Sequence, residues 1–143
     1  MKIRQVSVFI ENKSGRLSDV IEFLGDNGIN IRALSLADTS DFGILRLIVN
    51  DPERAYNLLR EKDFTVGSTD VIAVAVPDNP GGLASVLKLL KDHDVSVEYM
   101  YAYVEHSTDY AVMIFRFEDT DKTLELLKSN NVKLLSGSEI YSK

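Results

Sequence analysis

Two short polar loops that contain glycine are the segments of this sequence with the clearest binding chemistry. The first reads Glu11-Asn12-Lys13-Ser14-Gly15-Arg16-Leu17, and the second reads Asp78-Asn79-Pro80-Gly81-Gly82-Leu83. Each precedes an expected helix, whose first N–H groups and positive dipole end can bind a carboxylate. Asn12 or Asp78 at the start of a loop could accept a hydrogen bond from an ammonium group. Together these groups predict a site for an α-amino acid.

A purely structural interpretation of the same loops is open on the residues alone. Glycine relieves strain in a tight turn between a strand and a helix. Ser14 or Asn79 could cap the helix that follows. A single copy of the loop does not decide between the two interpretations.

The two loops occupy equivalent places in an internal repeat. At an offset of 66 residues, Gly15 aligns with Gly81 and Leu17 with Leu83. After a two-residue insertion the offset becomes 68, and the apolar strand positions Leu45, Leu47 and Val49 align with Met113, Phe115 and Phe117. Because the pattern persists along nearly the whole chain, we interpret it as a duplication.

Each copy has the periodicity of a strand, a helix, two strands, a helix and a strand. The first copy has predicted strands at 6–10, 29–37, 44–49 and 64–68, with one helix stopped by Asn27-Gly28 and another opened by Asp51-Pro52. The second copy repeats the order, with strands at 71–76, 95–104, 110–117 and 132–135 and helices at 83–92 and 121–130. We therefore predict an α+β fold made of two ferredoxin-like βαββαβ sandwiches in tandem, residues 1–69 and 70–143, packed side by side.

A family resemblance adds to this interpretation. The segment Val76-Pro77-Asp78-Asn79-Pro80-Gly81-Gly82-Leu83, with Val95-Ser96-Val97 after its helix, looks like the start of an ACT domain. The first-copy segment Ile10 to Leu17, with Gly28-Ile29-Asn30-Ile31 downstream, resembles the same family, in particular the ACT domains of acetolactate synthase regulatory subunits. The resemblance implies modules that bind small ligands, usually amino acids. It also implies that the loop of one module faces the second strand of its partner, with the ligand between them.

The resemblance implies ligand-binding residues in both copies. In the first copy they are Asn12, Ser14, Gly15, Arg16 and Leu17 on the loop and Asn30 and Ile31 on the second strand. In the second copy they are Asp78, Asn79, Gly81, Gly82 and Leu83 on the loop and Ser96 and Val97 on the strand. The copies differ, because Asp78 stands where the first has Asn12, Ser96 stands where it has Asn30, and the first copy lacks the proline that Pro80 supplies. The two sites need not share a ligand.

Composition excludes several other classes of function. The net charge is −6 and neither half has a basic stripe, which argues against nucleic-acid binding. Without cysteine there are no disulfides, thiolate metal sites or thiol nucleophiles. The longest strongly apolar run, 71–76, is far shorter than the roughly 20 residues that span a bilayer. We expect a cytoplasmic protein with no cofactor and no membrane partner.

The two histidines and a group of tyrosines are the other residues with side chains suited to chemistry. His93 is expected to cap a helix end, and His106 with Glu105 and Asp109 is too local to form a closed metal site. Tyr99, Tyr101 and Tyr103 should share one face of a strand, with Tyr110 on the next strand, and could pack the sheet or form the wall of a ligand site.

Nothing in the sequence predicts an enzyme, since it contains no catalytic triad, dinucleotide fingerprint or phosphate-binding loop. We predict a regulatory protein that binds a free amino acid and signals to a protein partner through ligand-dependent domain packing. The alternative is a regulatory subunit of an amino-acid biosynthetic enzyme such as acetolactate synthase. A homodimer is possible, since open strand edges invite pairing.

Overall fold

The computed structural model describes residues 1–11, 13–38, 42–103 and 109–141. The chain divides into two compact units: Arg4–Thr69 with Tyr141–Lys143, and Met1–Ile3 with Asp70–Ile140. We call them the N-terminal unit and the C-terminal unit. The first three residues of the chain thus belong to the C-terminal unit, and the last three to the N-terminal unit.

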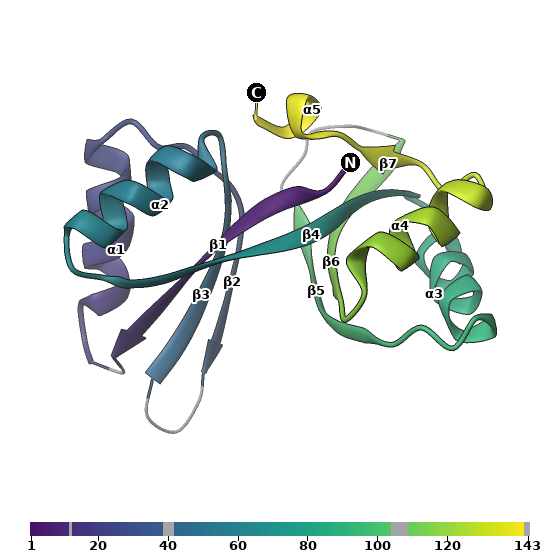
Figure 1. Cartoon of the computed structure of the whole chain (residues 1–143), viewed down its shortest axis with the longest axis horizontal. Helices are drawn as coiled ribbons and strands as arrows, with labels where there is room; N and C mark the ends of the chain where they lie inside the picture. The colour runs from purple at the N-terminus through teal and green to yellow at the C-terminus, as the bar shows by residue number, and fades with distance from the viewer. Residues whose placement is uncertain (12, 39–41, 104–108, 142–143) are drawn as a thin grey trace. The chain divides into compact units, whose positions relative to one another are not determined.

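The N-terminal unit is built from six elements. They are β1 (Ile3–Glu11), α1 (Arg16–Asp26), β2 (Ile31–Asp38), β3 (Phe42–Val49), α2 (Pro52–Glu61) and the first part of β4 (Thr65–Pro77). The strand order is β2-β3-β1-β4, and β3 is antiparallel to both of its neighbours. Both helices lie on the same face of this sheet (Figure 1).

The C-terminal unit repeats this arrangement. It contains the rest of β4, α3 (Gly82–Asp92), β5 (Val97–Tyr103), β6 (Tyr110–Phe117), α4 (Thr120–Ser129), β7 (Leu134–Leu135) and most of α5 (Gly137–Tyr141). Its strand order is β5-β6-β4-β7, which is the N-terminal order with each strand replaced by its repeat equivalent. The predicted α+β fold of two ferredoxin-like sandwiches in tandem is confirmed.

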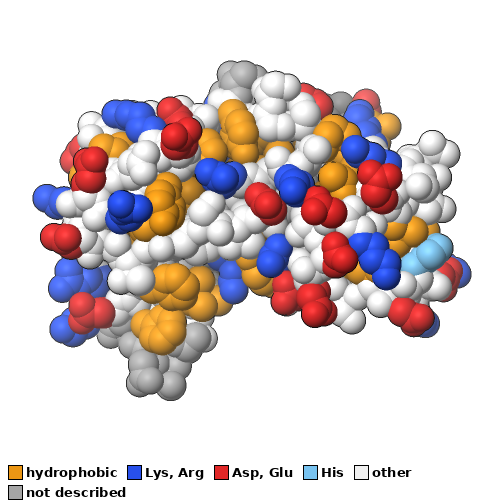
Figure 2. Space-filling model, in the orientation of Figure 1, with side chains coloured by type: hydrophobic (Ala, Val, Ile, Leu, Met, Phe, Trp, Pro, Cys, Tyr) orange, Lys and Arg blue, Asp and Glu red, His pale blue; other side chains and the backbone are white. Residues whose placement is uncertain are grey.

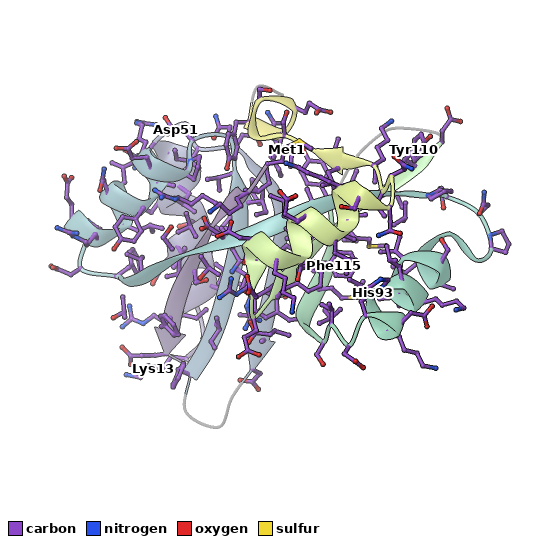
Figure 3. All side chains as sticks on the ribbon, turned by 45° about the vertical axis from the view of Figure 1, so that its right-hand side comes forward. Met1, Lys13, Asp51, His93, Tyr110 and Phe115 are labelled. Carbon is purple, nitrogen blue, oxygen red and sulfur yellow. The ribbon has the colours of Figure 1, made fainter. Side chains whose placement is uncertain are left out.

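Each unit has its own hydrophobic core between the sheet and its helices. In the N-terminal unit, alternate residues of β1 (Val6, Val8 and Ile10) face Leu24 of α1 and Leu59 of α2. The alternation follows from strand geometry, in which every second side chain points to the same face. In the C-terminal unit the stacked rings of Phe115 and Phe117, 5.6 Å apart, belong to the equivalent core (Figure 3).

The helix ends have the capping and terminating residues that the sequence predicts. Asp51 Oδ1 accepts a hydrogen bond from the Arg54 amide at 3.2 Å, with Pro52 in the first turn of α2. Gly28 ends α1 in the left-handed region with φ +73°. His93 is the C-cap of α3, and its Nδ1 lies 2.9 Å from the Leu89 carbonyl oxygen, which confirms the capping role.

Two elements differ from the sequence prediction. Strand β4 runs without interruption through the two segments predicted as separate strands, 64–68 and 71–76. The short helix α5 was missed, although its start carries a Ser-x-x-Glu signature: Ser136 Oγ accepts from the Glu139 amide, and Glu139 Oε1 accepts from the Ser136 amide.

Candidate functional site

The two glycine loops have the same backbone conformation. Gly15 (φ +89°, ψ −10°) and Gly81 (φ +89°, ψ −7°) are the N-cap residues of α1 and α3. Neither helix has a side-chain cap, so the alternative in which Ser14 or Asn79 caps it is wrong. The left-handed φ is the reason that glycine occupies both positions.

Matching hydrogen bonds hold the loops in this shape. The amide of Lys13 donates to the Glu11 carbonyl oxygen at 2.8 Å, as the amide of Asn79 donates to that of Pro77 at 2.9 Å. The next turn is closed from Arg16 to Lys13 in one unit and from Gly82 to Asn79 in the other. The duplication therefore preserved a specific turn and not merely a glycine.

Both helices begin with amides that are available to a ligand. Among the described residues there is no acceptor for the amides of Leu17 and Ser18 in α1, or of Leu83 and Ala84 in α3. A Cβ added at Gly15 or at Gly81 would have no neighbour within 4 Å. A side chain would thus find room at either glycine, and only the left-handed φ opposes it.

In the N-terminal unit the loop borders a depression of about 550 Å³, lined by residues of the loop and of the adjoining strand ends: Ile10, Glu11, Lys13, Ser14, Leu17, Leu36, Asp38 and Gly43. Register explains the gathering, because Gly43 of β3 pairs with Ile10 of β1 on one side and with Asp38 of β2 on the other. Of these residues, only Ser14 and Leu17 were predicted from the sequence.

Charge in this depression is concentrated on the loop. Lys13 Nζ lies 2.9 Å from Glu11 Oε2. The hydrogen bond and charge of Lys13, with a smaller effect from Arg16, lower the pKa of the Glu11 carboxyl. Arg16 also lies 3.6 Å from Asp19 on the first turn of α1. The site therefore carries both an ammonium group and carboxylates.

The equivalent loop of the C-terminal unit has different chemistry. Pro77 and Asn79 replace Glu11 and Lys13, so the ion pair is lost. Gly82 is buried where the first copy has the exposed Arg16. The amide of Asp78 donates to the Asp109 carbonyl oxygen at 3.1 Å, which ties this loop to the residue before β6.

The predicted strand residues lie far from the loop of their own unit. Asn30 and Ile31 stand at the start of β2, where the Asn30 amide donates to Asn50 Oδ1 at 2.9 Å. This is the end of the sheet that carries Asp51, opposite the end that carries Lys13 (Figure 3). The strand length between them is roughly 20 Å.

Ser96 and Val97 have the same place in the C-terminal unit, because Val97 pairs with Phe117 at the far end of β6 from Tyr110. Within one unit, the second strand therefore contributes its last residues to the surroundings of the loop, and not the first residues that were predicted. Asn12 lies outside the described residues.

Several apolar side chains of β1, β2 and β3 are exposed. Leu36 is 50 % exposed and Leu34 47 % exposed, and the rings of Phe9 and Phe42 meet edge to face at 5.9 Å. In Figure 2 hydrophobic side chains gather at the lower left of the visible face. The same view shows acidic and basic side chains interspersed, with no basic stripe on the visible face.

The remaining candidate residues are the tyrosines of β5 and the residues around His106. Tyr99, Tyr101 and Tyr103 pair with alternate residues of β6, which confirms that they share a face. His106 and Glu105 lie outside the described residues, within which no group of three acidic or histidine side chains could hold a metal ion. No helix in the described part of the chain is long and apolar enough to cross a membrane.

Comparison with known families decides the relationship. The model of the ACT domain pair family matches residues 1–142. The chain belongs to this family. The resemblance stated from the two loops is therefore confirmed, and both halves are ACT domains.

Solved structures agree with this assignment. Protein BT0572 from Bacteroides thetaiotaomicron is 43% identical with a TM-score of 0.93, and the match covers 100% of this ACT domain pair and 98% of that chain. The ligand-free regulatory subunit of aspartate kinase from Thermus thermophilus has a TM-score of 0.59 at 14% identity, over 90% of this chain and 92% of that one. At that identity the likeness shows the fold alone.

A relative of different length was also found. The probable translation initiation factor IF-2 of Methanobrevibacter smithii is 27% identical over 135 residues, which is 84% of this chain. The ACT domain pair spans only 23% of that protein.

Proposed function

We propose that this ACT domain pair is a regulatory protein that binds a free α-amino acid in the depression beside Gly15. The observation that carries the proposal is the opposed charge around one small space. The amide of Leu17 and the Lys13 ammonium suit a carboxylate, while Glu11 and Asp38 suit an ammonium group. A zwitterion satisfies both ends of this arrangement.

The size and lining of the depression support the same ligand. Its volume of about 550 Å³ is in the range of small-molecule sites. Ile10, Leu17 and Leu36 offer apolar surface to a side chain. The left-handed glycine lets the ligand approach the backbone closely.

Thermal unfolding in the presence of each of the twenty amino acids tests the proposal. A ligand at 100 times its Kd should stabilise the protein by about 2.7 kcal/mol. Glu11→Gln with Lys13→Gln should remove most of that shift. The matched control is Lys88→Gln with Asp92→Asn, which deletes another exposed ion pair, 2.7 Å long, on α3. If no amino acid raises the unfolding temperature, the proposal fails.

The second loop is proposed to bind a different ligand or to bind more weakly. Asp78 supplies a carboxylate there, but no lysine stands at the position of Lys13. Titration calorimetry on Asp78→Asn and on Lys13→Gln separates the two loops. If both variants lose the same binding event to the same extent, the two loops are equivalent and this proposal fails.

A regulatory role requires a target whose activity changes when the ligand binds, and we propose that this target is a second protein. Ligand binding can act only through different affinity for two states of the pair, typically 1–3 kcal/mol. A subunit role in a biosynthetic enzyme is a second candidate. It is supported by the similar fold of the regulatory subunits of aspartate kinase from Thermus thermophilus and Thermus flavus. The match covers 92% of the first of these chains and 86% of the second. Stable co-purification with a larger catalytic chain would favour it.

A further inference from the structure

A second groove of the N-terminal unit lies between α1 and the turn that leads into β4, and it shares Ile10 and Glu11 with the proposed amino-acid site. It has a volume of about 600 Å³. Phe9, Phe23 and Phe64 line it, and the rings of the last two lie 6.2 Å apart. The side chain of Phe9 alternates with the core residues Val8 and Ile10, and its ring contacts Phe42. Phe23 and Phe64 are half-buried, so part of each ring is left to form an apolar surface in the groove.

The lining of this groove has more acidic than basic groups, and its cations among the described residues are Arg16 and Lys62. Glu22 and Asp26 are one helical turn apart on α1, and Asp63 stands on the opposite bank. No cation of the described residues lies within 4 Å of any of the three carboxylates. Lys62 Nζ lies 5.9 Å from the centroid of the Phe23 ring, so a cation already occupies one face of this aromatic surface.

The repeat provides an internal comparison. The equivalent groove of the C-terminal unit is smaller, about 490 Å³, and has Ala75, Leu89 and Val132 in place of the three phenylalanines. Lys88 stands at the position of Glu22 and forms an ion pair with Asp92, the equivalent of Asp26. One copy thus has a small groove beside a neutralised helix, whereas the other has an aromatic and acidic groove. The fold alone requires neither feature.

We propose that the aromatic groove of the N-terminal unit docks a basic amphipathic segment of a partner protein, in which Lys or Arg residues alternate with aliphatic or aromatic ones. The carboxylates stand on both banks and extend about 6 Å along α1. A segment with several basic side chains can reach both banks while its apolar residues cover the rings. A single small cation would neutralise one bank only.

The test is a library of synthetic octapeptides presented to the full chain, followed by the Kd of the best binder in solution. Bound peptides should be enriched in Lys and Arg next to apolar residues, and binding should weaken with added salt.

Glu22→Lys should weaken binding of the best peptide by about tenfold, because it introduces a like charge at the rim of the groove. Phe23→Leu with Phe64→Val, which installs the residues of the other copy, should weaken it as well. The matched control Glu125→Lys makes the same charge change on exposed α4 and should leave the affinity unchanged.

Three results would overturn the proposal. The first is a library without basic binders, and the second is equal weakening by Glu22→Lys and Glu125→Lys. The third is competition by spermidine with an affinity equal to that of the best peptide, which would make the occupant a small polycation. Circular dichroism of each variant verifies that it is folded. The amino-acid thermal shift should be retained in Glu22→Lys, so failure here is distinct from failure of the ligand site.

Discussion

A Cβ atom added to Gly82 would lie 2.0 Å from the carbonyl oxygen of Pro77. Gly82 opens α3, and Pro77 ends β4, so this close approach fixes the angle at which the helix leaves the strand. At the equivalent place of the first copy, Arg16 carries a full side chain. The two loops share a turn but differ in how closely the helix approaches the strand.

Gly82→Ala should therefore destabilise the C-terminal unit. A backbone shift is required to relieve the contact, and such shifts cost about 1–3 kcal/mol. The control is Gly25→Ala on α1, where a new Cβ meets nothing within 4 Å and alanine favours the helix by about 0.5–1 kcal/mol. Urea unfolding followed by circular dichroism should move the midpoint down for the first and up for the second. Equal midpoints would show that the loop adjusts without cost.

The left-handed turn at Gly15 leads to a separate prediction. Nothing crowds this position, so a substitution is opposed only by its φ of +89°. Gly15→Ala should cost about 1–2 kcal/mol, and Gly15→Asn should cost less because asparagine tolerates the left-handed region. Chemical unfolding of both variants measures the difference. If alanine and asparagine are equally tolerated, the turn has changed conformation.

Much of the fold could be predicted from the sequence because the features concerned are local. The spacing of apolar residues predicted the order of the elements. Asp51-Pro52 predicted the start of α2, and the paired glycines predicted the turn that both copies share. The repeat supported each of these assignments a second time. The extent of β4 was not predictable in this way, since a strand ends where its pairing ends and not where its periodicity weakens.

The lining of the candidate site was less predictable. Leu36, Asp38 and Gly43 reach the loop only through the register of β2 on β3 and of β3 on β1. No local pattern encodes that register. The acidic groove was missed for the same reason, because Phe9, Phe23 and Phe64 come from β1, α1 and the turn before β4, and each alone is an ordinary apolar residue.

The ion pair between Lys13 and Glu11 predicts how the candidate site responds to pH. Lys13 lowers the pKa of Glu11 in the folded chain. A depressed carboxyl pKa contributes stability that is present above the unfolded value and is lost as the pH falls through the folded value. The Glu11 carboxyl should therefore titrate below its ordinary pH range.

Carbon-detected NMR of the side-chain carboxyl checks this directly. In Lys13→Met the pKa of Glu11 should return toward its ordinary value, since the hydrogen bond and the positive charge are both lost. Lys122→Met on α4 removes an exposed lysine far from the loop in sequence and should leave the pKa of Glu11 unchanged. An unchanged Glu11 pKa in Lys13→Met would mean that the pair does not persist in solution.

The helix ends of the two copies differ at one left-handed position, and the repeat predicts the consequence. Gly28 follows α1 with φ +73°, and its equivalent Asp94 follows α3 with φ +56°. Both positions lie in the same turn, in which the next amide reaches back to Leu24 in one copy and to Leu90 in the other, each at 2.9 Å. Glycine adopts this conformation without steric cost, whereas aspartate does not.

Asp94→Gly should therefore stabilise the C-terminal unit by about 1 kcal/mol, and Gly28→Asp should destabilise the N-terminal unit by a similar amount. Denaturant midpoints of the two variants should move in opposite directions, and a shift of the same sign in both would mean that backbone strain does not control these turns.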